Sequence, residues 1–514
     1  MKRLIILTSA LLLIFALSFA SIYGGVALLE EYGIDLGERS FNYDYVIKNG
    51  TIIDGTGGEI YQGDLAIRRG KITFIGIIEP PASVPVIDAT DLFILPGFID
   101  LYSPLDLDRA QKSNLTGLLS QGVTTMVVGY GDLSEDHAVS LMERQSQKRW
   151  PLNSAFLAGH EGLSGYLTPL DLLYDFDYFD ALSETTTYSF NSAFGQEQSS
   201  INLAELEREV KRSLQAGAMG LFIDFDQGPG KQLTYDEVKV LATALKEQEK
   251  VLVLTMPSDP IDPVALLNRI LKLQEETKVS ILLTPWDYLA TAEEGMVQIL
   301  AEMLEEAQKS QYLRMAFYPS TTQREGLRQP LQRAYARYAA ESIEIVAVDG
   351  QNDYSLIGKT LAEVATESNS SVTATAQSLM SRGSVQVALR LYQRERYEQF
   401  ISSPHTFLTA HWDLAGSESK TIMNYLESQF TRNPDELILI DIAKKLAGDP
   451  ATFLGLEGRG TIAVENWADL VLINPRAFYE EGEAVPYLFV NGTLVYEDGN
   501  LLEPNPGLIL GRKR

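Results

Sequence analysis

The chain has 514 residues, 45% of them hydrophobic, which is enough for one large domain with a smaller companion. Its formal net charge of −27 disfavours binding to nucleic acid, because the phosphates would be repelled. The chain has no cysteine, which excludes disulfides, thiolate nucleophiles and cysteine-ligated zinc, and it has only four histidines.

The chain begins with a basic Met1-Lys2-Arg3 and an uncharged apolar run from Leu4 to Leu29. A basic start, an apolar core and small residues ending at Ala20 are typical of a cleaved secretory signal peptide. The whole run is also long enough to cross a bilayer as one helix and to anchor the protein. Both interpretations place the rest of the chain outside the cytoplasm, either secreted or periplasmic, or in contact with the membrane through residues 4–29. We assign residues 1–29 to this segment and residues 30–43 to a linker.

Residues 44–95 and 456–514 show strand periodicity interrupted by turn residues. Asn49-Gly50 predicts a hairpin turn, and Arg69-Gly70 predicts another. The first motif, VIKNGTIIDG, is repeated near the other end of the chain as LFVNGTLVYEDG. We therefore expect the two ends to complete one small β-sandwich domain, with a larger domain between them.

Residues 96–455 alternate short apolar runs with amphipathic stretches, which predicts a (β/α)8 TIM-like barrel. Thr234, with Glu237 three residues on, predicts a capping box at the start of one helix. A segment rich in Ser, Thr and Arg, about 343–400, is expected to be a helical insertion over the barrel mouth. The predicted strands lie within residues 93–102, 122–130, 154–159, 219–225, 250–256, 278–284, 312–319 and 405–411.

Several motifs occur in a fixed order along residues 44–512, among them VIDATDLFILPGFIDLYS, GVTTMVVG, AGHEGLSGY and GRGTIAVENWADLVLINP. Together they resemble the amidohydrolase superfamily, and within it the N-acyl-D-amino-acid deacylases, or D-aminoacylases. The resemblance implies a distorted barrel with a small β-sandwich. It also implies zinc-assisted hydrolysis of an amide C–N bond, with an aspartate after strand eight that transfers the proton.

The chain departs from the family at each metal-ligand position that can be aligned. These positions hold Tyr102, Pro104, Gly131, Met256 and Leu283, and none of these residues suits zinc. The sequence therefore predicts no metal cofactor, although the family uses zinc. An oxygen-only site for calcium or magnesium, built from Asp100, Asp106, Asp132 and Asp259, stays open as an alternative.

The residues expected to line the ligand pocket are Tyr102, His160, Tyr318 and His411. His160 and Tyr318 match pocket positions of the family, whereas the family's aspartate falls on His411, with Asp413 two residues further on. His160 and His411 are candidates for a metal-free acid and base, since histidine titrates near neutral pH. Alternatively, His160 only holds its loop, Tyr318 packs within the barrel, and His411 fills the space that a metal would occupy.

Three hypotheses on function follow. We favour a non-catalytic relative of the deacylases that binds a ligand or partner, such as a small acylated amino acid or a component of the cell envelope. The first alternative is an active hydrolase of C–N bonds with a rebuilt metal site or the histidine pair. The second is a structural protein of the envelope.

Overall fold

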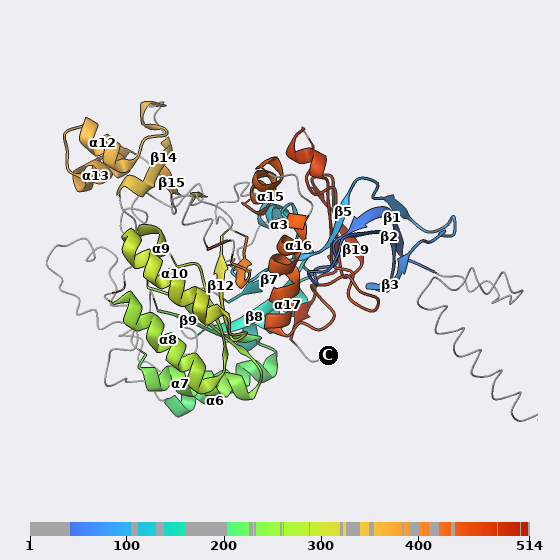
Figure 1. The fold of residues 1–514 in the computed structure, drawn as a ribbon, viewed down its shortest axis with the longest axis horizontal. Helices are drawn as coiled ribbons and strands as arrows, with labels where there is room; N and C mark the ends of the chain where they lie inside the picture. The colour runs from blue at the N-terminus through green and yellow to red at the C-terminus, as the bar shows by residue number, and fades with distance from the viewer. Residues whose placement is uncertain are drawn as a thin grey trace, which may run out of the picture.

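We describe the fold from a computed structural model of the chain (Figure 1). No helix among the described residues is long and apolar enough to cross a membrane. The apolar run Leu4–Leu29 and Ala20 lie outside these residues. The structure describes residues 42–103, 112–129, 138–159, 203–225, 230, 233–257, 260, 262–286, 288–318, 322–324, 340–348, 354–382, 385–390, 400–401, 403–410, 421–432, 437–480, 482–503 and 505–511.

The small β-domain is built from both ends of the described chain, as predicted. One nine-stranded sheet has the order β20-β19-β18-β17-β5-β1-β2-β3, with β4 beside β1. Antiparallel pairing of β17 with β5 joins the two parts. The strands are β1 (Tyr45–Ile52), β2 (Tyr61–Arg68), β3 (Lys71–Gly76), β4 (Val86–Asp88), β5 (Phe93–Pro96), β17 (Leu470–Ile473), β18 (Tyr487–Val490), β19 (Thr493–Glu497) and β20 (Asn500–Leu501).

The first Asn-Gly pair does not form the predicted hairpin turn. Asn49 and Gly50 lie inside β1, which pairs with β2 on both sides of a β-bulge. Asn49 has a φ of 63°, and its N–H donates to the Asp64 carboxylate at 2.9 Å. A left-handed Asn followed by Gly suits a bulge as well as a hairpin, so the pattern alone does not separate them. Arg69-Gly70 and Asn491-Gly492 do form the expected turns, before β3 and β19 respectively.

The large domain is the predicted barrel. Its eight parallel strands have the order β16-β12-β11-β10-β9-β8-β7-β6. Each coincides with a predicted apolar run, and only β8 begins one residue before its run. The first run is divided at Gly97, so that β5 joins the small sheet and only β6 joins the barrel. A Cβ at Gly97 would lie 2.2 Å from the Thr124 side chain, so only glycine fits this crossing. The strands are β6 (Phe98–Asp100), β7 (Val123–Val128), β8 (Asn153–Gly159), β9 (Gly220–Asp224), β10 (Val251–Thr255), β11 (Ser280–Leu283), β12 (Leu313–Phe317) and β16 (Thr406–Leu408).

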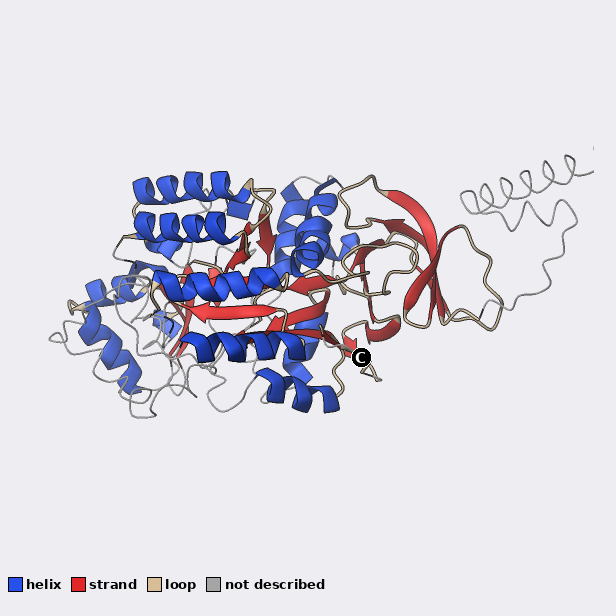
Figure 2. Cartoon of the chain, turned by 90° about the horizontal axis from the view of Figure 1, so that it is seen from below, coloured by secondary structure: helices blue, strands red, loops and turns tan. Residues whose placement is uncertain are grey.

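Amphipathic helices lie along the outside of the barrel strands (Figure 2). The α7 helix begins with the predicted capping box, in which Thr234 and Glu237 satisfy each other's backbone N–H groups. The buried stripes of these helices complete the main hydrophobic core. The helices are α3 (Lys112–Leu119), α4 (Ala138–Gln147), α6 (Leu203–Ala216), α7 (Tyr235–Glu247), α8 (Pro263–Thr277), α9 (Tyr288–Thr291), α10 (Glu294–Gln308), α15 (Thr421–Arg432) and α16 (Leu437–Ala443).

The N-terminal end of the barrel, which we call its base, is closed by two elements from the last part of the chain. Helix α17 (Asp449–Leu454) contributes Leu454, and strand β21 (Ile509–Leu510) contributes Leu510, to the apolar cluster inside the barrel. Strand β21 also pairs in parallel with the first half of β8. The base is therefore packed shut, and a ligand at the barrel axis must enter from the C-terminal end, which we call the mouth.

Between β12 and β16 the chain forms a separate subdomain on the side of the molecule away from the small β-domain (Figure 1). The expected helices are present as α12 (Leu361–Glu367) and α13 (Val372–Arg382). They accompany an antiparallel sheet of β13 (Thr322–Arg324), β15 (Val385–Arg390) and β14 (Ile343–Val348), which the sequence analysis does not predict. β14 and β15 do have alternating buried residues, but the polar composition of the surrounding segment made this strand pattern hard to recognise in the sequence.

Candidate functional site at the barrel mouth

A buried carboxyl group, that of Asp100, lies at the mouth where the first and last barrel strands meet. Asp100 ends β6 and is 1% exposed. Its Oδ1 accepts hydrogen bonds from the Thr409 hydroxyl and, at 3.2 Å, from the N–H of Ala410. The N–H of Tyr102 in turn donates to Thr409 Oγ1 at 3.2 Å. These bonds join β6 to the residues after β16, the two strands at the ends of the ladder order.

The carboxyl of Asp100 lies beside the hydroxyl of Ser103. Asp100 Oδ2 and Ser103 Oγ are both buried, and neither forms a hydrogen bond of standard geometry within the described part of the chain. Burial raises the pKa of Asp100 to about 6, although the interactions with Thr409, Tyr102, Ala410 and Ser103 act in the opposite direction. A buried carboxyl with these properties at a strand end is a candidate for binding or proton transfer.

Two tyrosines form an aromatic pair beside this carboxyl. Tyr102 follows β6 and Tyr318 follows β12, and their ring centroids lie 6.2 Å apart with an interplanar angle of 57°. Tyr318 is largely buried, whereas Tyr102 is partly exposed. Both were predicted to line the pocket from their positions after strands, and the fold brings them together. The pair offers apolar ring faces at the mouth.

The ends of β10 and β11 are apolar and tightly packed. Met256 follows β10 and is 2% exposed, and Leu283 ends β11 and is 0% exposed. Beside them, the Thr284 hydroxyl lies 3.2 Å from the Thr255 hydroxyl, and the Trp286 indole N–H donates to the Pro257 carbonyl at 2.8 Å. These contacts fix the two strand ends to each other.

Several predicted site residues cannot be placed. His160, His411, Asp413, Pro104 and Gly131 lie outside the described residues, as do His137 and the remaining aspartates of the oxygen-only alternative, Asp106, Asp132 and Asp259. His405 directly precedes β16, so it lies at the base and away from the mouth. Burial lowers the pKa of His405, and the nearby cations Arg314 and Lys444 act in the same direction.

Sequence analysis missed two residues of this site, Thr409 and Ser103. Thr409 stands directly after β16, whereas the alignment with the family points to His411, two residues later. Ser103 lies between the two positions that match the family's metal-binding pair. The end-of-strand rule, applied without the family pattern, would have drawn attention to Thr409.

The barrel and the composite small sheet together form the architecture that the resemblance to the amidohydrolases implies. Comparison with known sequences finds relatives at low identity. The chain is 25% identical to an N-acyl-D-aspartate deacylase of Alcaligenes xylosoxydans xylosoxydans over 496 residues, 91% of this chain and 95% of the relative. It is 23% identical to a D-aminoacylase of the same organism over 510 residues, which cover 91% and 98% of the two chains. No protein-family model matches the chain.

The solved structures lead to the same group of proteins. An N-acyl-D-glutamate deacylase from Bordetella bronchiseptica, complexed with zinc and a phosphonate inhibitor, superposes with a TM-score of 0.68 at 20% identity. That match covers 91% of this chain and 99% of the other. A crystal structure of a D-aminoacylase gives a TM-score of 0.69 at 19% identity, covering 91% and 100% of the two chains. The homologues and structural neighbours that match most of this chain therefore include several N-acyl-D-amino-acid deacylases.

Zinc, which is present in the Bordetella structure, does not fit the strand ends that can be described here. Zinc needs N, O or S ligands that converge at about 2 Å. Leu283 has no donor atom, the thioether of Met256 is a soft and weak one, and both side chains are buried in the core. Within the described residues, no three side chains of His, Asp or Glu come together as a metal site.

Proposed function

We propose that this chain is a metal-independent relative of the D-aminoacylases that binds a small N-acylated amino acid at the barrel mouth without hydrolysing it. The observation that carries the proposal is the pair of buried apolar side chains, Met256 and Leu283, at the ends of β10 and β11. Both occupy positions where the family resemblance calls for zinc ligands, and neither side chain supplies one. Without a Lewis acid, an amide carbonyl at this site lacks its main source of activation.

The composition of the mouth supports binding over a purely structural role. The buried carboxyl of Asp100 and the hydroxyl of Ser103 lie together at the end of β6. The aromatic pair of Tyr102 and Tyr318 lies at the same end of the barrel and suits an acyl chain. Polar groups beside an apolar surface are what a small amphipathic ligand requires.

A second candidate is hydrolysis of an amide C–N bond, and one observation favours it. The pKa of Asp100 is raised to about 6, in the range of a general acid or base that works near neutral pH. Such an activity needs a second group to polarise the carbonyl. The sequence offers His160 and His411 for this role.

The test combines three measurements on the purified protein. We expect elemental analysis to find no stoichiometric zinc, N-acetyl-D-amino acids to raise the melting temperature, and free amine not to be released from them. Stoichiometric zinc or sustained amine release would overturn the proposal in favour of the hydrolase. No thermal shift with any N-acylated amino acid would favour the structural alternative.

Two tyrosines at opposite ends of β12 provide a matched pair of variants. Tyr318 follows the strand at the mouth, whereas Tyr312 precedes it at the base. Tyr318→Leu should abolish the ligand-induced thermal shift, and Tyr312→Leu should leave it unchanged. Equal effects of the two variants would show that the ligand does not bind at the mouth.

We further propose that the protein works outside the cytoplasm, where the apolar run Leu4–Leu29 directs or holds it. The test is a fusion of residues 1–43 to a reporter enzyme that is active only after export. An inactive reporter would contradict the proposal. Mass spectrometry of the exported fusion would show whether the chain is cleaved after Ala20.

A further inference from the structure

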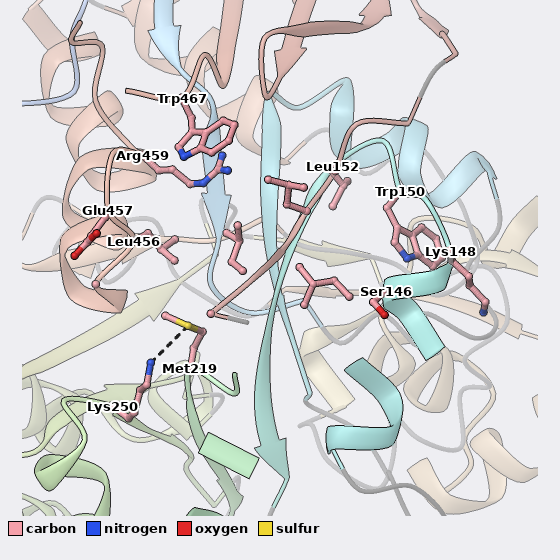
Figure 3. A pocket seen from close by; sticks show the side chains of 16 residues that line it. Ser146, Lys148, Trp150, Leu152, Met219, Lys250, Leu456, Glu457, Arg459 and Trp467 are labelled. Atoms are coloured by element: carbon pink, nitrogen blue, oxygen red, sulfur yellow. Dashed lines mark hydrogen bonds between the residues drawn. The ribbon is translucent and has the colours of Figure 1, made fainter. Parts of the chain in front are cut away.

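A cavity with a volume of about 610 Å³ lies at the base of the barrel (Figure 3). It is bounded by the residues that lead into β8, β9 and β10, by the segment after α17 and by the C-terminal segment around β21. Lys250 directly precedes β10 and lines this cavity, whereas Met256 directly follows the same strand at the mouth. The cavity is thus separated from the mouth by the length of the barrel strands. Its volume is typical of small-molecule sites.

The cavity is positively charged in a strongly acidic protein. Its lining contains three cationic side chains, Lys148, Lys250 and Arg459, and one acidic side chain, Glu457. The whole chain has 69 acidic residues against 42 basic ones. A local excess of positive charge attracts small anions.

Lys250 is the cation of this cavity whose ammonium group can still donate strong hydrogen bonds to a ligand. Its side chain is half-buried, and its ammonium group points toward Met219, whose sulfur lies 3.9 Å away (Figure 3). A thioether is only a weak acceptor, and no carboxylate of the described residues forms an ion pair with Lys250. Burial lowers the pKa of Lys250, which shows that water solvates the charge poorly. An anion at this position would compensate the charge.

The other side of the cavity is rigid and largely apolar. The Arg459 guanidinium is already paired with Asp469 and donates to Asn491 Oδ1 at 2.7 Å. It also stacks against the Trp467 ring, 4.8 Å from its centroid. Leu456 and Leu508 add aliphatic surface to the lining. Arg459 therefore shapes this wall, while Lys250 is available to a ligand.

We propose that this cavity binds a small organic anion, with its phosphate or carboxylate group on the Lys250 ammonium and its apolar body against Leu456 and Trp467. The site is distinct from the mouth, and it does not depend on the function proposed there. Phosphate and carboxylate share the chemistry that Lys250 recognises, which is an oxyanion with several hydrogen-bond acceptors. The apolar wall adds a preference for anions that carry a ring or an aliphatic group.

The test is titration of the full-length protein with phenyl phosphate, and separately with inorganic phosphate and benzoate, followed by calorimetry and tryptophan fluorescence. Two of the four tryptophans, Trp150 and Trp467, line the cavity. We expect saturable binding of phenyl phosphate that is weakened by salt and is tighter than that of inorganic phosphate. Comparison with benzoate identifies which oxyanion is preferred. Absence of saturable binding of all three at millimolar concentration would overturn the proposal.

Four variants locate the site. Lys250→Gln should weaken binding by about tenfold or more, the size expected when a charged hydrogen bond is lost. Lys250→Arg, which keeps the charge, and Lys272→Gln, which removes an exposed lysine from helix α8, should bind as the original chain does. Leu456→Trp should block the cavity while Lys250 is unchanged, so it tests the site even where Lys250→Gln does not fold.

Unaltered binding by both Lys250→Gln and Leu456→Trp would place the anion elsewhere and overturn the proposal. The thermal shift with N-acetyl-D-amino acids gives an independent readout of the mouth. Lys250→Gln should leave that shift unchanged. The two measurements therefore test the anion site at the base and the ligand site at the mouth independently, and one proposal can fail while the other holds.

Discussion

The two ends of the barrel carry buried polar clusters of different size. At the base, the side chains of Asn153, Arg459, Asp469 and Asn491 form one network. Asn491 donates to Asn153 Oδ1 at 2.7 Å, and its own N–H donates to Asp469 Oδ1 at 2.7 Å. At the mouth, the cluster consists of Asp100 with Thr409 and the backbone N–H of Ala410.

The difference shows which end of the barrel holds the two domains together. The base network joins β8 of the barrel to Asp469 and Asn491 of the small β-domain, and through the Leu508 N–H, 3.0 Å from Asn153 Oδ1, to the C-terminal segment. A hydrogen-bonded buried network of this kind fixes one arrangement of these parts. The Asp100 cluster at the mouth joins only β6 to the residues after β16.

The largest effect is expected when Arg459 is replaced, because this tests directly how much the buried network at the base contributes to stability. Arg459→Met leaves Asp469 as a buried carboxylate without its cation, and loss of one partner of a buried ion pair costs about 3–5 kcal/mol. We expect the free energy of unfolding in urea to fall by about this amount. The matched control is Arg476→Met, because Arg476 pairs with Asp91 at 2.5 Å on the exposed surface of the same domain. An exposed pair contributes about 1 kcal/mol or less, so equal losses would refute the contrast between buried and exposed pairs.

The second prediction concerns the pH dependence of the mouth. Asp100 has a folded-state pKa of about 6, raised from 3.8 mainly by burial. The folded state therefore holds this proton more tightly than the unfolded state does. The stabilisation is complete below pH 3.8, decreases as pH rises from there, and is lost above about pH 6. Each pKa unit corresponds to about 1.4 kcal/mol, so the full change is about 3 kcal/mol.

Asp100→Asn isolates this effect, because an amide cannot titrate. Urea unfolding of both proteins between about pH 4 and pH 8 should show the original chain losing about 3 kcal/mol relative to the variant as pH rises. Contributions from all other groups cancel in the difference. Parallel curves for the two proteins would show that Asp100 is not the buried titrating carboxyl.

The sequence predicts the barrel well because parallel strands buried on both faces are continuous apolar runs. All eight barrel strands coincide with such runs, and Tyr102 and Tyr318 were expected at the mouth from their alignment with positions of the family. The prediction of a hairpin at Asn49-Gly50 was wrong, because a left-handed Asn followed by Gly occurs in both turns and bulges. Only the strand that pairs with these residues, here β2, distinguishes the two.

The partners of Asp100 could not be predicted from the sequence. Its hydrogen bond with Thr409 joins residues 309 positions apart, and no local pattern encodes such a contact. The same holds for the base network, in which Asn153 and Asn491 meet across 338 positions. Both contacts exist only because the ends of the sheet and the two domains come together, so they depend on the tertiary fold.

The third prediction tests the link between the first and last barrel strands. Thr409→Val removes the hydroxyl that donates to Asp100 and accepts from the Tyr102 N–H. Leaving buried polar groups unpaired costs about 1–3 kcal/mol, and we expect a loss near the middle of that range. Hydrogen exchange should also show faster exchange at the ends of β6 and β16 than in the original chain. Unchanged exchange at β6 would show that Thr409 does not hold this strand.

The smallest expected effect is at the packed ends of β10 and β11, where the Thr255 and Thr284 hydroxyls lie 3.2 Å apart. Replacing one of them with Val leaves the other hydroxyl unpaired and should cost about 1 kcal/mol, whereas replacing both with Val should cost less than the sum. The double-mutant cycle by urea unfolding measures this coupling directly. A strong coupling indicates that these strand ends are as firmly paired as the base. Strict additivity would show instead that the two hydroxyls act independently. The hydrogen bond between them would then not hold the ends of β10 and β11 together.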